Sequence, residues 1–166
     1  MMITTMRNRL IELGRQIREM LHLTAHRSFY GLIAVFMGAP IAFLAFLAMN
    51  ANNMGTSILS IIQSNPATAI LTISALLDFM EGYSLWMLRN EVLKSARNYR
   101  AVMTILSLQQ IMVGNLVGVG ISALSLTLSG SLTKQNAPVA ASLKTVMALF
   151  SVFYVGCLLL TLKIAF

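Results

Sequence analysis

Three long stretches of the chain, residues 28–49, 101–132 and 145–162, contain no Lys, Arg, Asp or Glu. They are filled mainly with Leu, Ile, Ala, Met and Phe, and the first of them contains Pro40, where we expect a kink. A helix needs roughly 20 apolar residues to cross about 30 Å of hydrocarbon. The pattern therefore predicts an all-α integral membrane protein.

Together with a second apolar region around Pro66, these stretches predict a four-transmembrane-helix bundle over residues 28–166. The four expected spans cover about 29–49, 66–88, 101–129 and 141–164. The second span has two possible registers. In one it begins after Asn65-Pro66 and runs to Leu88, preceded by a short interfacial helix. In the other it begins at Ser57 and leaves the membrane near Asp78.

Residues 1–27 precede the first span and show a different pattern. Apolar residues recur every three or four positions there, which is the spacing of one face of a helix, and arginines occupy the other faces. We expect an amphipathic helix on the cytoplasmic side that docks on the membrane or on a partner. Its apolar face comprises Met6, Leu10, Leu13, Ile17 and Met20.

The positive charges flank the apolar stretches and indicate an orientation. Of the 166 residues, 57% are hydrophobic and 10% are charged, with a formal net charge of +7. Lys and Arg concentrate in the N-terminal tail and in residues 89–100, whereas residues 50–66 carry none. Lys and Arg accumulate in cytoplasmic loops. We therefore expect a multi-pass protein of a bacterial inner (plasma) membrane with both termini cytoplasmic, in which Lys144 is the exception and snorkels. The charge placement favours anionic headgroups as the contact and not nucleic acid.

Asp78 and Glu81 are the most informative charged residues, because their spacing puts them on one helical face. In the first register both lie inside the hydrocarbon, where carboxyl groups are costly and mark an ion path or a buried partner contact. In the second register they lie in an interfacial helix. The sequence leaves both readings open.

The third expected span combines amides with small residues. Small residues spaced by four let helix backbones approach closely, and amides form hydrogen bonds between helices. We expect a helix-packing face, with a polar lining of a substrate cavity as the alternative. The residues of this face are Gln110, Gly114, Asn115, Gly118 and Ser122.

Ordinary catalytic chemistry is not indicated. The chain has no HExxH, GxSxG, P-loop or GxGxxG motif. A lone cysteine, Cys157, gives no intrachain disulfide, and His22 and His26 have no further ligands nearby in the sequence. We expect neither enzymatic activity nor a cofactor or metal.

These features favour a non-catalytic integral membrane subunit of a multiprotein inner-membrane complex, such as a secretion or conjugation apparatus or a transporter assembly. Its expected partners are the lipid bilayer and other membrane subunits, with a homo-oligomer as a further option. A small ion-coupled transporter or channel that uses Asp78 and Glu81 is the alternative. A self-protection (immunity) or regulatory membrane protein is the second alternative.

Overall fold

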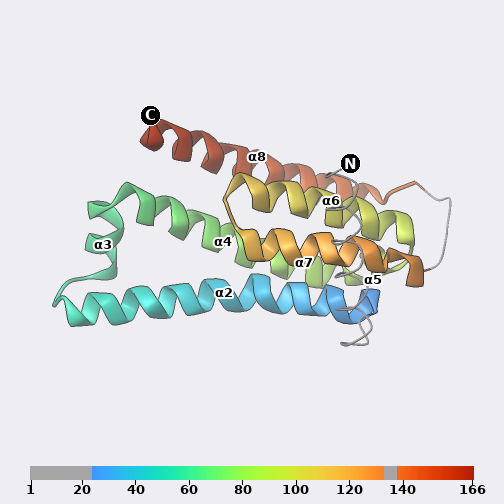
Figure 1. Cartoon of the computed structure of the whole chain (residues 1–166), viewed down its shortest axis with the longest axis horizontal. Helices are drawn as coiled ribbons and strands as arrows, with labels where there is room; N and C mark the ends of the chain where they lie inside the picture. Colours follow the sequence, from blue (N-terminus) through green and yellow to red (C-terminus); the bar gives the residue numbers. More distant parts are fainter. Residues whose placement is uncertain (1–23, 133–137) are drawn as a thin grey trace, which may run out of the picture.

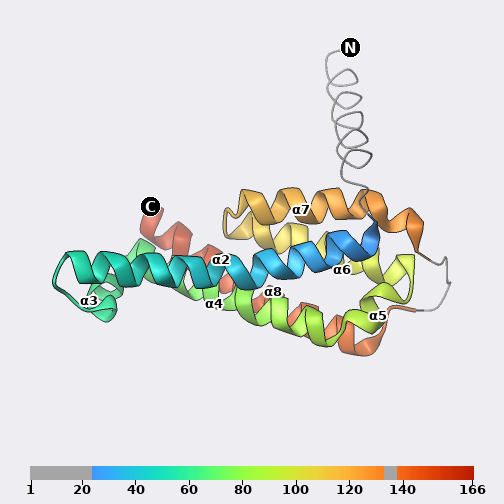
Figure 2. The same cartoon turned by 90° about the horizontal axis from the view of Figure 1, so that it is seen from below.

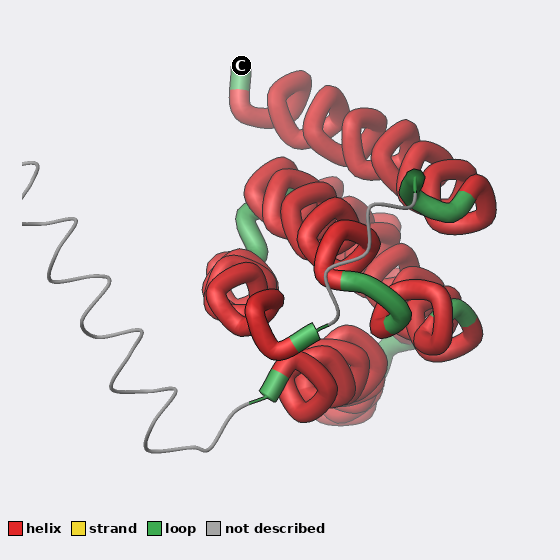
Figure 3. Tube along the Cα trace, turned by 90° about the vertical axis from the view of Figure 1, so that its right-hand side faces the viewer, coloured by secondary structure: helices red, strands yellow, loops and turns green. Residues whose placement is uncertain are grey.

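The structure is a computed structural model that describes residues 24–132 and 138–166, and their regular structure is entirely helical. Within residues 24–132, short loops join the helices (Figures 1 and 3). In chain order they are α2 (Ala25–Asn53), α3 (Ile58–Ser64), α4 (Pro66–Met87), α5 (Arg89–Leu93), α6 (Ala96–Met112), α7 (Leu116–Thr127), the 3-10 helix η1 (Leu128–Ser131) and α8 (Ala141–Ala165). The expected helix over residues 1–27, with Met6, Leu10, Leu13, Ile17 and Met20, lies outside the described residues.

Two helices, α2 and α8, are long and apolar enough to cross a membrane. The pair α3 and α4 makes a third candidate if it is counted as one span, although the two helices meet at a bend of 117°. These helices expose many large apolar side chains, such as Phe46 at 58%, Leu71 at 54% and Leu159 at 62%. Surfaces of this kind are typical of a protein that faces lipid, which indicates a membrane protein.

The break between α3 and α4 is set by Asn65 and Pro66. The Asn65 side chain caps α4 by accepting a hydrogen bond from the Ala67 N–H at 2.9 Å. Pro66 occupies the first turn, where its missing N–H costs nothing and its fixed φ suits the helix. The helix boundaries thus agree with the first of the two registers, in which a short helix precedes a long one that starts at Pro66.

Residues 101–129, expected to form one long helix, form two. After α6 the chain passes through Gly114, whose φ of +71° suits a residue without a side chain, and Asn115 then caps α7. The helices α6 and α7 lie side by side and run in opposite directions (Figures 1 and 2). The Ser107 and Ser122 hydroxyls are 2.8 Å apart across this hairpin. The prediction of a single third span is therefore wrong, because an apolar run does not reveal where its backbone turns.

The hairpin packs between the long helices. Helix α7 contacts α2, α6 contacts α8, and α4 contacts both α2 and α8. A buried core joins them near the end of the molecule where α2 begins, with Phe29, Tyr99, Leu106 and Met147 among its residues. Gly82 lets α4 approach α2 closely, since a Cβ added there would lie 2.9 Å from the Phe36 Cβ.

The chain thus runs the length of the molecule along α2, α4 and α8, and four long helices are not found among residues 24–132 and 138–166. The start of α2, the helix α5, the start of α6 and the start of α8 lie at one end (Figure 1). The C-terminus of α8 lies at the other. Lys144, the exception in the sequence-based orientation, is in the first turn of α8 and so falls at the same end as Arg27, Arg89 and Arg100.

Candidate functional site

Asp78 and Glu81 lie in the middle of α4 and are both buried. Asp78 is 12 residues after Pro66 and 9 before Met87, or about 18 Å and 14 Å along a helix at roughly 1.5 Å per residue. Asp78 is 9% exposed and Glu81 is fully buried. Asp78 is thus far from both ends of α4, whereas Glu81 lies 6 residues before Met87, or about 9 Å along the helix.

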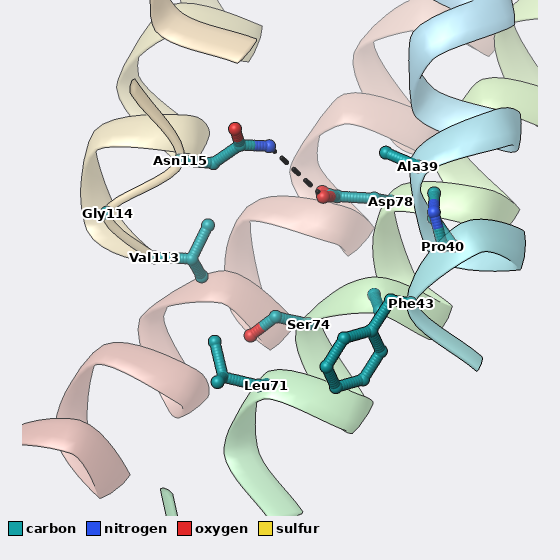
Figure 4. A pocket seen from close by; sticks show the side chains of 10 residues that line it. Ala39, Pro40, Phe43, Leu71, Ser74, Asp78, Val113, Gly114 and Asn115 are labelled. Carbon is teal, nitrogen blue, oxygen red and sulfur yellow. Dashed lines mark hydrogen bonds between the residues drawn. The ribbon is translucent and has the colours of Figure 1, made fainter. Parts of the chain in front are cut away.

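Three helices supply hydrogen-bond donors to Asp78. The Gln110 amide of α6 donates to its Oδ1 at 2.9 Å, and the Tyr154 hydroxyl of α8 lies 2.5 Å from the same oxygen. The Asn115 amide at the start of α7 donates to its Oδ2 at 3.3 Å (Figure 4). A carboxylate can accept about four hydrogen bonds, so Asp78 is well supplied with donors.

Glu81 is less well satisfied. Its Oε2 lies 3.1 Å from the Tyr154 hydroxyl, and its Oε1 is buried without a hydrogen-bond partner among the described residues. The polar side chains that contact the two carboxyl groups are Tyr154, Gln110 and Asn115, all neutral. No Lys or Arg of the described segments forms a salt bridge with either group, so the positive charge that would balance an ionised carboxylate is not supplied by that part of the chain.

The hairpin tip holds these donors in place. The Asn115 amide also donates to the Gln110 Oε1 at 2.6 Å, and the Asn115 Oδ1 accepts from the Gly118 N–H at 3.0 Å. A Cβ added to Gly118 would lie 2.6 Å from the Gln110 Oε1 and 2.9 Å from its Cγ, so a larger residue there would displace the Gln110 amide. The hairpin backbone therefore holds the Asn115 amide, and Asn115 in turn holds the Gln110 amide.

The structure places the expected packing residues in different roles. Gln110, Asn115, Gly118 and Ser122 lie where α6 faces α7, and Ser122 also bonds to the Gly118 carbonyl at 2.7 Å. Gly114 has no neighbour within 4 Å of an added Cβ and forms the turn. We expected the Gln110 and Asn115 amides to form contacts between separate spans. In the structure they connect the two arms of one hairpin and also donate to the Asp78 carboxylate.

Asp78 faces a cavity of about 300 Å³ between α2, α4 and the hairpin tip. Its wall is largely apolar and includes Pro40 of α2 (Figure 4). A second cavity of about 310 Å³ shares Leu71, Ser74 and Val113 with the first and extends toward the C-terminal residues of α8. The lining residues of the first cavity are Ala39, Pro40, Phe43, Leu71, Ser74, Ala75, Asp78, Val113, Gly114 and Asn115.

One residue of this site, Tyr154, was missed from the sequence. Tyr154 is fully buried at the middle of α8, 13 residues after Ala141 and 11 before Ala165. A buried tyrosine hydroxyl needs a polar partner. A tyrosine within an apolar run is therefore the sequence signal for such a contact. Gln109 is buried beside Gln110 and donates to the Met147 carbonyl at 3.2 Å and the Ser151 hydroxyl at 3.0 Å, so it attaches α6 to α8.

Other candidates lie away from this cluster. His26 is exposed near the start of α2, whereas Cys157 is buried in α8. Within residues 24–132 and 138–166, no three His, Cys, Asp or Glu residues come together as a metal site would require. Comparison with protein-family models, with curated proteins and with solved structures finds no match to this chain.

Proposed function

We propose that the chain is a small ion-coupled membrane transport protein in which Asp78, assisted by Glu81, binds a proton at the middle of the membrane. The observation that carries this proposal is a carboxyl group buried at mid-helix, supplied only with neutral donors among the described residues and facing a cavity. This is the alternative that the sequence left open for the two acidic residues.

In this proposal α2, α4 and α8 cross the membrane, and α6 and α7 form a re-entrant hairpin whose tip reaches the middle. The basic end of the molecule then faces the cytoplasm, as Lys and Arg in short loops favour. The C-terminus of α8 lies on the opposite side in this proposal, which departs from the expectation that both termini are cytoplasmic. The exposed rings of Tyr83 and Trp86, near the end of α4, fit the aromatic belt at that interface, where Arg89 stacks on Trp86 at 5.0 Å.

The cost of burying carboxyl groups supports a functional role. Acidic residues inside a membrane are rare and by default mark ion paths, proton relays or a buried partner. Transport proteins also place their ion sites near the midplane at helices that are interrupted there. Here Asp78 meets the break between α6 and α7 and the Pro40 region of α2. Irregular backbone is tolerated at this depth where it lines a cavity.

A proton suits the geometry better than a metal ion. The Tyr154 hydroxyl lies within hydrogen-bond distance of both Asp78 and Glu81 but carries a single proton. Satisfying both contacts requires a second proton, held by one of the two carboxyl groups. Among the described residues, the one titratable side chain that hydrogen-bonds to Asp78 is Tyr154, which also contacts Glu81, since the contacts from α6 and α7 are the amides of Gln110 and Asn115.

The proposal is tested with the purified chain alone in liposomes. With a pH gradient imposed, we expect protons to cross the membrane, which a pH-sensitive dye inside the liposomes measures as a proton current, and we expect Asp78→Asn to abolish it. Glu91→Gln is the matched control, because it removes one negative charge from α5, outside the site. The control should retain the current. An Asp78→Asn protein that folds and still carries the same current would refute the proposal.

The role as a non-catalytic subunit of a larger complex remains a second prediction. The apolar faces of α2, α4 and α8 are broad enough to accept protein as well as lipid. The polar faces that suggested a partner, however, are occupied within the chain itself. Fixed partners that co-purify in mild detergent, together with no current from the chain alone, would favour the subunit role.

A further inference from the structure

We infer that the cavity beside Asp78 binds a small apolar organic cation, an amine or quaternary ammonium, with the Asp78 carboxylate as its counter-ion. This inference rests on the proposed function and names its substrate class. The proton and the organic cation would then use the same carboxyl group in alternation.

The chemistry of the cavity wall selects the ligand class. Apart from Asp78, Ser74 and Asn115, the lining is apolar and includes the aromatic ring of Phe43 (Figure 4). An apolar body is favoured by such a wall, and a cationic group is favoured by a carboxylate whose contacts are all neutral. A compact inorganic cation would gain nothing from the apolar wall, whereas a neutral apolar molecule would leave the carboxylate unbalanced.

The surroundings of the cavity provide a route for such a ligand. Leu71 lines both cavities and is 54% exposed on the outer surface of α4. An amphiphilic cation dissolved in the lipid can therefore reach the wall of the site sideways. The second cavity continues from the shared residues past Thr161 toward Ile164, near the end of α8. The two cavities together lead from the middle of the molecule to the end where α8 finishes, beside Lys163.

The exchange step conserves charge. When the cation binds, the protonated carboxyl group of Asp78 releases its proton to water on one side, and the carboxylate pairs with the cation. When the cation leaves, the carboxylate takes up a proton from the other side. No covalent bond of the cation changes, and a proton gradient supplies the driving force.

The probe is benzyltrimethylammonium, which carries a fixed charge, an aromatic ring and no exchangeable proton. Calorimetry of the purified chain in weakly buffered detergent measures binding and proton release together. We expect saturable binding with about one proton released per cation, following from the exchange on a single carboxyl group. Asp78→Asn should weaken binding by about tenfold or more and abolish the release, while Glu91→Gln should leave both unchanged.

A steric pair tests the position of the site. Ala75→Leu fills the cavity that Ala75 lines and should also weaken binding, whereas Ala34→Leu adds the same bulk on the exposed side of α2 and should not. Neopentylbenzene, the neutral carbon analogue of the probe, should not compete for the site.

Equal affinity in Asp78→Asn and the wild type, or competition by neopentylbenzene, would overturn the inference. Failure to bind the probe by a chain that still carries the Asp78-dependent proton current would overturn the inference alone and leave the proposed function standing. Binding with proton release in a chain that carries no current, with or without the probe, would instead overturn the proposed transport function.

Discussion

At the scale of single residues, Asp78 is held by donors from three separate helices, α6, α7 and α8. Hydrogen bonds to an ionised group contribute about 1.5–3 kcal/mol each. A network of this kind fixes the position of the carboxyl group while its surroundings remain neutral. The residues that build the network therefore set both the stability and the proposed activity.

Tyr154→Phe should destabilise the protein, because it removes the hydroxyl that contacts both Asp78 and Glu81. We expect a loss of about 1–3 kcal/mol and a smaller proton current. Cys157 is 3% exposed, so its alkylation by a thiol reagent during heating reports unfolding in detergent. Tyr83→Phe is the control, since Tyr83 is 50% exposed and should tolerate the change. Equal midpoints for Tyr154→Phe and the wild type would contradict the role of this hydroxyl.

Gly118→Leu should displace the amides that hold Asp78, because even a Cβ at this position lies 2.6 Å from the Gln110 Oε1. Overpacking of this kind costs typically about 1–3 kcal/mol. Gly120→Leu, two residues along the same helix, meets nothing within 4 Å at its Cβ and serves as the control. The same alkylation assay compares the two variants. If both unfold at one temperature, the close contact at Gly118 does not exist.

At the scale of elements, the sequence predicts the helices well where a cap and an apolar run coincide. Asn65 and Pro66 start α4 where the first register expects it. The apolar composition of 101–129 does not reveal the turn, because two apolar hairpin arms and one long span have the same composition. Gly114 and Asn115 mark the turn by backbone conformation and capping. In the sequence, the same two residues are equally compatible with the helix-packing face that we expected there.

The candidate site residues likewise fall into those that stand out in the sequence and those that only the fold brings together. Asp78 and Glu81 are identified from the sequence, because a carboxyl group in an apolar run is unusual. Their partners come from segments 32 and 76 residues further along the chain, at Gln110 and Tyr154. Only the folded path of the chain brings such residues together, so their joint role cannot be deduced from spacing.

A disulfide between positions 107 and 122 tests the hairpin directly. In a Cys157→Ala background, Ser107→Cys with Ser122→Cys should cross-link on mild oxidation, since the two serine hydroxyls are 2.8 Å apart. In one continuous helix the same positions would be about 22 Å apart, far beyond disulfide reach. Ser107→Cys with Thr127→Cys is the control pair and should stay reduced. Without a cross-link in the first pair, α6 and α7 cannot form the hairpin described here.

At the scale of the whole molecule, the three long helices α2, α4 and α8 and the α6–α7 hairpin are arranged so that most of the basic residues lie at one end. Arg27, Arg89, Arg100 and Lys144 all belong to helix ends that lie there. A bundle of four full spans would instead place Lys144 at the opposite end. In this fold Lys144 is therefore no longer an exception to the clustering of basic residues at one end. Lys163, in the last turn of α8, lies at the other end.

Cysteine labelling from either side of the membrane should separate the two topologies. With Cys157→Ala as the background, Gly130→Cys should react from the same side as Lys94→Cys, because η1 and α5 lie at one end of the molecule. Asn53→Cys and Phe166→Cys should react from the other side. Labelling of Gly130→Cys from the side of Asn53→Cys would mean that residues 101–129 cross the membrane.

The central claim is that protons from bulk water reach Asp78 in the middle of the molecule. Infrared difference spectroscopy of the chain reconstituted in lipid measures this, because a protonated carboxyl group has a C=O stretch that its carboxylate lacks. We predict a band that appears and disappears reversibly as the bulk pH is cycled, that is absent from Asp78→Asn and that persists in Glu91→Gln. A spectrum in which this band does not respond to pH while the protein stays folded would show that Asp78 is a static structural group and would contradict the account.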